Sequence, residues 1–152
     1  MHAIEAQMLI RKPAAEVFRA FTDPAVTRNF WFTKSSGPLE SGNRVTWEWE
    51  MYNVSSEVKV KEILPDRKIV VDWGEPATTV EFNFETLAPD RTYVRIRNYG
   101  FPQEGDQLIA AMMDATGGFT TVLDGLKAYL EHNINLNLIA DKFPKANVQN
   151  EQ

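Results

Sequence analysis

The sequence contains no cysteine, and its only two histidines, His2 and His132, stand near opposite ends of 152 residues. The lack of cysteine excludes disulfides, thiolate nucleophiles and cysteine-based zinc sites. Neither a calcium-loop pattern nor a closely spaced pair of histidines is present, so a metal site would have to be built from carboxylates. We therefore expect neither a bound metal nor a cofactor.

Long hydrophobic runs and an excess of positive charge are also missing. No run approaches the roughly 18 apolar residues that a membrane-spanning helix needs, and the N-terminus lacks the basic-then-apolar order of a secretory signal. The net charge of −5 and the isoelectric point near 5.1 argue against nucleic acid, whose phosphates are bound mainly by clustered lysine and arginine. We therefore expect a cytoplasmic protein that contacts neither membrane nor nucleic acid.

What is present is the composition of a soluble globular protein, with 43% hydrophobic and 24% charged residues. A chain of 152 residues fits one domain, because larger cores tend to split. We expect a single domain over residues 1–143, followed by a polar C-terminal tail over residues 144–152.

The first third of the chain indicates a strand followed by two short helices. Residues Ile4 to Ile10 alternate loosely in polarity, and Pro13 then suits the first turn of a helix, where its missing N–H would be unpaired anyway. Asp23 and Pro24 end that helix and offer a cap and a first-turn proline to a second one. The aromatic run Phe30 to Phe32 follows at the end of the second helix, either as a lid over a pocket or, as we favour, as an anchor in the core.

The middle of the chain changes to a period of two, which is typical of strands. In the clearest strand, Trp47 and Trp49 alternate with Glu48 and Glu50, so that large apolar groups share one face and carboxylates the other. Connections as short as those that follow can join only antiparallel neighbours. Together with the first strand, a six-stranded sheet results, and its remaining strands are predicted over residues 54–64, 69–73, 78–87 and 92–99.

The last third indicates one long amphipathic helix, from about Asp106 to His132, with an apolar stripe at helical spacing. Gly117 and Gly118 interrupt its middle, which predicts a kink or the close approach of another backbone. A sheet of this size twists and coils, and a single helix laid across its concave face cannot fill all the space. The order of elements therefore predicts a cavity between the sheet and the helix.

Several motifs spread over nearly the whole chain carry a resemblance to a known family. They are Pro13-Ala14-Ala15-Glu16-Val17-Phe18 with Phe21 and Asp23-Pro24, Phe30-Trp31-Phe32, Trp47-Glu48-Trp49, Asn98-Tyr99-Gly100-Phe101, and Gly117-Gly118-Phe119 leading into Leu123-Asp124-Gly125-Leu126-Lys127. Together they resemble the START-like superfamily, also called SRPBCC or helix-grip proteins, and within it the activator of heat-shock protein ATPase homologue-like family. Phe119 stands where many relatives have tryptophan, a change that keeps an aromatic side chain in the core.

The resemblance implies an α+β helix-grip fold: a curved six-stranded antiparallel sheet wrapped around a long C-terminal helix, with two short helices between the first two strands. It also implies a deep pocket between sheet and helix, which the superfamily uses for lipids, sterols, polyketides or plant hormones. Some relatives are aromatases or cyclases and others are carriers, so the resemblance leaves the ligand and any reaction open.

The residues expected to line the pocket come from the inner face of the sheet and from the long helix. Tryptophan rings can stack on a flat ligand, although they can equally fill a core that holds no ligand. A buried amide needs a partner in the protein, in water or in a ligand, and flexible methionines adapt to varied ligands but more often simply pack. The predicted ligand-binding residues are Trp47, Trp49, Trp73, Phe82, Asn98, Met112, Thr116 and Phe119.

Carboxylates that could serve acid and base chemistry are expected to point away from the pocket. Alternation turns four of them outward: Glu48, Glu50, Asp72 and Glu81. Unless a bulge re-aims one of these, they form a solvated face. Arg95 and Arg97 share that face, where cross-strand pairing with the carboxylates is a simpler account than a protein contact. We therefore predict no catalytic residue.

Three functions remain open on the sequence alone. The first is a carrier or sensor of a small apolar or aromatic ligand. The second is a polyketide cyclase/aromatase-like or hydrolase-like enzyme, which would need an ionisable group inside the pocket. The third is a chaperone-interacting protein, ranked last because the co-chaperones that gave the family its name carry an additional N-terminal domain. A homodimer is compatible with the sequence, which does not determine the oligomeric state.

Overall fold

The computed structural model describes residues 2–148; Met1 and residues 149–152, the end of the predicted polar tail, lie outside the described residues. Its strands form one antiparallel sheet in the order β1-β7-β6-β5-β4-β3-β2. The strands are β1 (Ala3–Ile10), β2 (Lys34–Ser35), β3 (Arg44–Trp49), β4 (Val54–Leu64), β5 (Lys68–Trp73), β6 (Thr78–Ala88) and β7 (Arg91–Tyr99). The helices are α1 (Ala14–Thr22), α2 (Pro24–Thr27), the 3-10 turn η1 (Glu50–Tyr52), α3 (Gly105–His132) and α4 (Leu138–Lys142).

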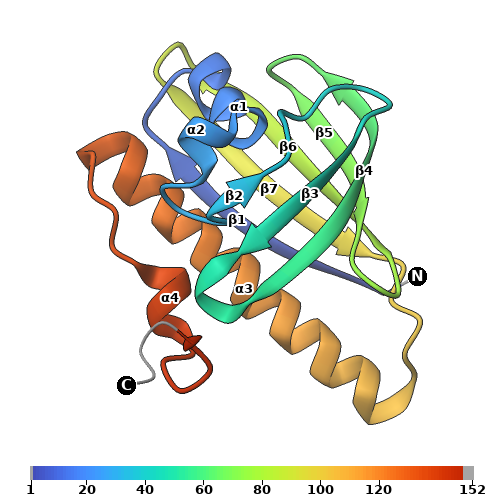
Figure 1. Ribbon diagram of the computed structural model, residues 1–152. Helices are drawn as coiled ribbons and strands as arrows, with labels where there is room; N and C mark the ends of the chain where they lie inside the picture. The colour runs from blue at the N-terminus through green and yellow to red at the C-terminus, as the bar shows by residue number, and fades with distance from the viewer. Residues whose placement is uncertain (1, 149–152) are drawn as a thin grey trace.

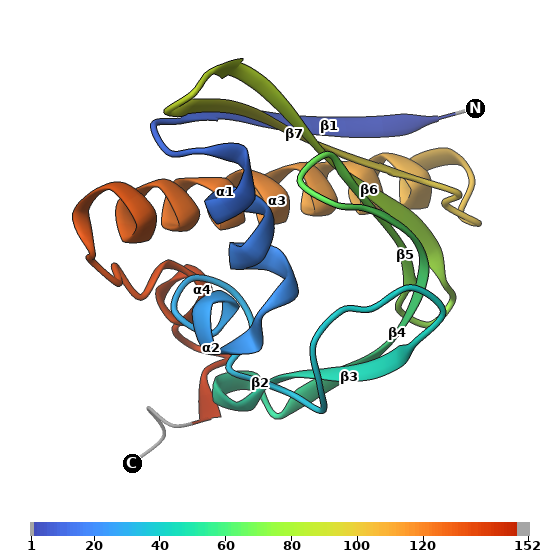
Figure 2. The same cartoon turned by 90° about the horizontal axis from the view of Figure 1, so that it is seen from above.

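The predicted α+β helix-grip arrangement is confirmed (Figure 1). Figure 2 shows the sheet curving from β1 and β7 on one side of α3, through β6, β5 and β4, to β3 and β2 on the other. The two short helices α1 and α2 fill one end of this curve, and α3 packs mainly against β1. None of the helices in residues 2–148 is long and apolar enough to cross a membrane.

The sheet has seven strands, one more than the sequence predicted. The additional strand is β2, which pairs with β3 through Lys34 opposite Glu48 and Ser35 opposite Trp47. Two residues are too few to show an alternating pattern, so periodicity could not have revealed this strand. β3 also ends earlier than predicted, because the chain turns at η1 and Asn53 adopts a left-handed conformation with φ 51°. Met51, in this turn, is buried.

Local capping explains the two short helices. The backbone N–H of Asp23 donates to the carbonyl of Arg19 at the end of α1, and the side-chain Oδ1 of Asp23 accepts from the N–H of Ala25 at 3.0 Å. One residue therefore ends α1 and caps α2, as the sequence predicted. The aromatic run Phe30 to Phe32 lies just after α2 rather than on it, and all three of its side chains are buried, so the run anchors this end of the core.

The long helix α3 runs without interruption, so Gly117 and Gly118 do not break it. The close backbone approach predicted there is found at Gly125 instead, where a Cβ atom would stand 3.3 Å from both Cβ and O of Phe30. A Cβ atom added to Gly118 would meet nothing within 4 Å. Gly125 thus lets the aromatic run pack against the helix, whereas Gly118 borders open space.

Candidate ligand-binding site

A cavity of about 750 Å³ lies between the sheet, at one end of its strands, residues 111–122 of α3 and the α4 segment. Neighbouring strands are antiparallel, so the last residues of β3, β5 and β7 lie beside the first residues of β4 and β6 at this end of the sheet. Each of these strands contributes a lining residue there: Trp49 from β3, Ser56 from β4, Trp73 from β5, Thr78 from β6 and Asn98 from β7. The site is therefore assembled from segments far apart in the sequence.

Small side chains make up half of the helical wall of the cavity. The lining residues of α3 are Ala111, Asp114, Ala115, Gly118, Phe119 and Val122. Their spacing of three and four residues places them on one face of the helix. Because alanine or glycine stands at three of these six positions, the helix approaches the sheet without filling the space between them. The cavity follows from the size of these side chains as much as from the curvature of the sheet.

Four aromatic rings form the inner wall of the cavity: Trp31, Trp49, Trp73 and Phe119. The Trp73 ring centroid lies 5.8 Å from that of Trp31, 6.0 Å from that of Trp49 and 5.7 Å from that of Phe119. These separations are typical of edge-on and tilted aromatic contacts. Trp73 is the only one of the four that is not fully buried, so its ring is the part of the wall most open to the cavity.

Asn98 is the buried amide of the site. Its side chain is only 2% exposed, and its Nδ2 donates hydrogen bonds to Oγ1 of Thr78 at 3.0 Å and to the backbone carbonyl of Thr79 at 2.8 Å. Both partners belong to β6, the neighbouring strand, so the amide is positioned by the sheet. A buried amide was expected to need a partner, and the protein itself supplies partners for the Asn98 nitrogen.

Gln103 is a second amide in the lining, from the loop between β7 and α3. Its Oε1 is buried and has no hydrogen-bond partner in the structure. A buried acceptor left without a donor costs roughly 1–3 kcal/mol. Sequence analysis missed this residue, because it follows the last strand in a loop where neither periodicity nor a motif singles it out.

The C-terminal segment covers one side of the cavity. From α4 and the residues after it, Ile139, Lys142, Phe143 and Ala146 join the lining. Tyr52 fastens this segment, because its single O–H is shared between the backbone carbonyls of Ile139 and Ala140 and its oxygen accepts from the N–H of Phe143 at 3.3 Å. The segment is therefore tied to the β3–β4 connection across the mouth of the site.

The charged groups of the lining lie at its rim. They are Asp114 on α3 and Lys142 on α4, both of them exposed. The Nζ of Lys142 donates to Oγ1 of Thr121 at 3.3 Å and stands 5.8 Å from the ring centroid of Phe143. Within residues 2–148 no cluster of His, Asp and Glu side chains is placed to hold a metal ion. The inner part of the cavity thus has aromatic and amide groups but no charge.

The carboxylates of the sheet lie on its outer face, where lysines pair with them more than the predicted arginines do. Glu81 Oε1 is 3.3 Å from Lys68 Nζ. Burial raises the pKa of Glu81, but the hydrogen bonds from Tyr99 and Lys68 and the charges of Lys68 and Arg97 outweigh it, so this pKa lies below its usual value. The same hydrogen bond to Glu81 raises the pKa of Tyr99.

Four of the eight residues predicted to bind a ligand lie on the cavity wall: Trp49, Trp73, Asn98 and Phe119. Trp47 and Phe82 share the inner face of the sheet but lie behind the wall, each only 1% exposed. The Trp47 ring stacks on Phe32 with centroids 5.0 Å apart, and the Phe82 ring lies 5.1 Å from that of Phe21. Alternation identifies the face of a strand but not its depth, so it could not separate these two residues from the lining.

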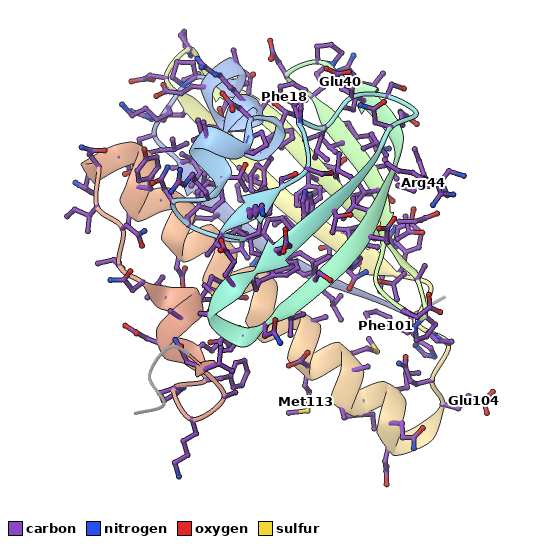
Figure 3. All side chains as sticks on the ribbon, viewed as in Figure 1. Phe18, Glu40, Arg44, Phe101, Glu104 and Met113 are labelled. Carbon is purple, nitrogen blue, oxygen red and sulfur yellow. The ribbon has the colours of Figure 1, made fainter. Side chains whose placement is uncertain are left out.

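Met112 and Thr116 lie on a different side of α3 from the cavity. They line a separate depression of about 450 Å³ together with Ile4, Ile109, Met113 and Gly117. Figure 3 shows Met113 pointing outward from this half of the helix, where its side chain is 70% exposed. The sequence signal for the cavity side of α3 is the set Ala111, Ala115 and Gly118 at helical spacing, which an expectation based on large apolar residues does not include.

Comparison with solved structures finds the same fold in other proteins. The protein SSP2350 from Staphylococcus saprophyticus is 27% identical over 89% of this chain and 96% of that chain, with a TM-score of 0.78. DynU16, from the dynemicin biosynthetic locus, is 16% identical with a TM-score of 0.77, and the match covers 88% of this chain but 48% of DynU16. The Aha1 dimer from Colwellia psychrerythraea is 20% identical over 87% of this chain and 98% of that chain, with a TM-score of 0.70.

A comparison with curated proteins found no match. Residues 11–131, by contrast, match the family described as activator of Hsp90 ATPase homolog 1-like protein. That range runs from the end of β1 to the last turn of α3, so it includes the aromatic wall and both amides but not α4. The chain therefore belongs to the family of activator of Hsp90 ATPase homolog 1-like proteins.

Proposed function

We propose that this domain binds a small apolar or aromatic molecule in the cavity between the sheet, α3 and α4, as a carrier or a sensor. The observation that carries the proposal is the wall of four aromatic rings around a cavity of about 750 Å³. Sites for small molecules usually measure about 300–1,000 Å³ and combine apolar walls with a few polar groups. Trp49, Trp73, Asn98 and Phe119, together with Trp31, are the proposed contact residues.

Binding is favoured over catalysis by the placement of the ionisable groups. General acid and base chemistry needs a titratable side chain within hydrogen-bond reach of the reacting group. The hydroxyl of Tyr52 is occupied by three backbone groups, and Asp114 and Lys142 stand exposed at the rim. No contact within residues 2–148 favours a cyclase-like or chaperone-interacting role over binding. The structural likeness to DynU16, at 16% identity, supports the fold and not a reaction.

Fluorescence of N-phenyl-1-naphthylamine, a neutral aromatic probe, tests the proposal. We expect the probe to become brighter when it enters the cavity and to quench the tryptophans of the wall. Trp73→Ala removes the most open ring of the wall, so it is expected to weaken probe binding about tenfold, since stacking on one aromatic side chain contributes roughly 0.5–1.5 kcal/mol beyond its buried area.

Met113→Ala is the matched control, because Met113 lines the separate depression that includes Ile4 of β1, and its side chain is 70% exposed. The proposal requires unchanged probe affinity in this variant. If Met113→Ala weakens binding and Trp73→Ala does not, the ligand occupies the depression beside Met113 and Ile4, and the proposed site is wrong. Failure of the wild-type protein to bind the probe at all, or to carry any molecule detectable by native mass spectrometry, would contradict a ligand-binding role.

A further inference from the structure

The Asn98 side chain stands in an apolar part of the sheet. On β7 it lies opposite Ile4 of β1 and Val80 of β6, and the next inward residue along its own strand is Ile96. Burying an amide among apolar neighbours is unfavourable unless its polar atoms are hydrogen-bonded. The Nδ2 of Asn98 is satisfied by Thr78 and Thr79, and no residue in the range 2–148 donates a hydrogen bond to its Oδ1 in the structure.

The orientation of the Asn98 amide follows from its partners. A backbone carbonyl can only accept a hydrogen bond, so the group 2.8 Å from the carbonyl of Thr79 must be the NH₂. Turning the amide over would place two acceptors against each other. Asn98 therefore presents its Oδ1, an obligatory acceptor, on the side away from β6, and it does so within the lining of the cavity.

Gln103 adds a second amide to the same cavity, with different freedom. Among residues 2–148 its buried Oε1 has no partner, and no carbonyl group of these residues holds its NH₂ in place. The Gln103 amide can therefore turn to offer either an acceptor or a donor to a bound molecule. The Asn98 amide therefore offers a ligand only an acceptor, in a defined direction, whereas the Gln103 amide can offer either an acceptor or a donor.

The charges around the cavity favour a neutral occupant. The charged lining residues, Asp114 and Lys142, have opposite signs and are both exposed at the rim. The aromatic wall and Asn98 lie deeper, where the part of the chain that the structure describes offers no ammonium or guanidinium group to balance a ligand anion. An ionised ligand would lose its hydration there without gaining a partner of opposite charge.

We propose that the cavity selects neutral aromatic molecules that carry a hydroxyl or N–H group, and that this group donates a hydrogen bond to Oδ1 of Asn98. The inference rests on the proposed function, since it concerns the ligand class of the same cavity. A ligand without a donor covers Oδ1 and removes it from water with nothing in exchange. A ligand with a donor pairs the acceptor and keeps the stacking on the aromatic wall.

Three matched ligands test this selectivity: 2-naphthol, 2-methoxynaphthalene and naphthalene, each measured at pH 7 by displacement of N-phenyl-1-naphthylamine. We expect 2-naphthol to bind about tenfold tighter than the other two, as one buried hydrogen bond implies. Affinities that agree within about twofold would overturn the donor selectivity and leave the ligand-binding role standing. If the probe and all three ligands fail to bind, the ligand-binding role is itself wrong.

Asn98→Ala locates the acceptor, and Asn83→Ala is its matched control. Asn83 is an asparagine on the outer face of β6 whose Nδ2 bonds to the carbonyl of Arg95 at 3.5 Å, so its loss disturbs the sheet without touching the cavity. The preference for 2-naphthol is expected to disappear in Asn98→Ala and to persist in Asn83→Ala. Persistence of the preference in a folded Asn98→Ala protein would overturn the assignment. If Asn98→Ala does not fold, the wild-type ligand series decides the proposal.

Discussion

The two halves of α3 lie against the same sheet but differ in what they bury. Within residues 105–118 no side chain is buried, whereas Phe119, Val122, Leu123 and Leu126 in the second half all are. On its inner side the first half carries Ala111, Ala115 and Gly118. A helix with large apolar residues closes a core, and the same helix with small ones leaves a cavity. Side-chain size along one helix thus separates the packed end of the molecule from the cavity, with Phe119 and Val122 at the boundary between them.

Polar contacts follow the same division. At the second half of α3, Lys127 Nζ donates to the carbonyl of Leu9 and to Oε2 of Glu131, both at 2.7 Å. The backbone N–H of Arg11 donates to the same Oε2 at 2.9 Å. These contacts join the helix to the end of β1. Across residues 2–148, no ion pair joins the first half of α3 to the sheet, so this half is held less firmly.

The largest difference between the halves is expected from leucine truncation. Leu123→Ala removes a fully buried side chain and should lower the free energy of unfolding by about 2–5 kcal/mol through lost burial and a new void. Leu108→Ala makes the same change in the first half, where the side chain is only half-buried, and should cost clearly less. Urea unfolding followed by circular dichroism measures both. Equal losses would contradict the division into a packed and an open half.

Removing the charge of Glu131 should have the next largest effect. Burial raises the pKa of Glu131, but hydrogen bonds from Lys127 and Arg11 and the charge of Lys127 outweigh it, so this pKa lies below its usual value. A lowered pKa stabilises the folded protein above the usual carboxyl value, and this stabilisation is lost as the pH falls through the folded pKa. Glu131→Gln should therefore cost about 2 kcal/mol at pH 7, as measured by urea unfolding.

The same comparison at acid pH is the control for the Glu131 effect. Below the folded pKa the wild-type carboxyl is also neutral, so the two proteins should then unfold at similar urea concentrations. A difference that stays constant between neutral and acid pH would show that packing, rather than charge, is what Glu131 supplies.

Loosening the α4 segment should cost less. Tyr52→Phe deletes the hydroxyl that holds the backbone of Ile139, Ala140 and Phe143, and about 1 kcal/mol of stability is expected to be lost. Hydrogen exchange should speed up at the backbone amides of α4 and of Phe143, while those of β7 keep their protection. Unchanged exchange in α4 would mean that its apolar contacts alone hold the segment in place.

The smallest effect on stability, with a large effect on binding, is expected when the open half is filled. Ala115→Leu places a larger side chain into the cavity and should change the free energy of unfolding by less than about 1 kcal/mol, because the added group enters existing space. Binding of N-phenyl-1-naphthylamine should be strongly reduced. Ala110→Leu, on an exposed face outside the lining, is the matched control and should bind the probe normally.

Much of the fold could be predicted because its elements follow local patterns. The alternation of Trp47 and Trp49 with Glu48 and Glu50 fixes which face of β3 is buried, and Asp23 marks the boundary of two helices by its capping chemistry. The prediction was wrong for β2, which is too short to show a period, and for the site of close backbone approach, found at Gly125. Both depend on which segments meet in space.

The candidate site could be predicted only in part. Trp49, Trp73, Asn98 and Phe119 lie on the cavity wall, and all four stand at positions where alternation or helical spacing turns a side chain inward. Whether such a residue lines a cavity or is covered by other rings depends on its neighbours, as Trp47 shows by stacking on Phe32. The ligand-binding role of the eight predicted residues stays a prediction until a ligand is observed.

The sequence by itself determined the α+β class, the faces of the strands, the limits of α3 and the family, because these depend on period, capping and motif. Only the tertiary structure decided where the cavity lies and what surrounds it. The curvature of the sheet, the small side chains of α3 and the tie from Tyr52 to α4 together leave that space open. A void is a property of several segments at once, so no single stretch of sequence contains it.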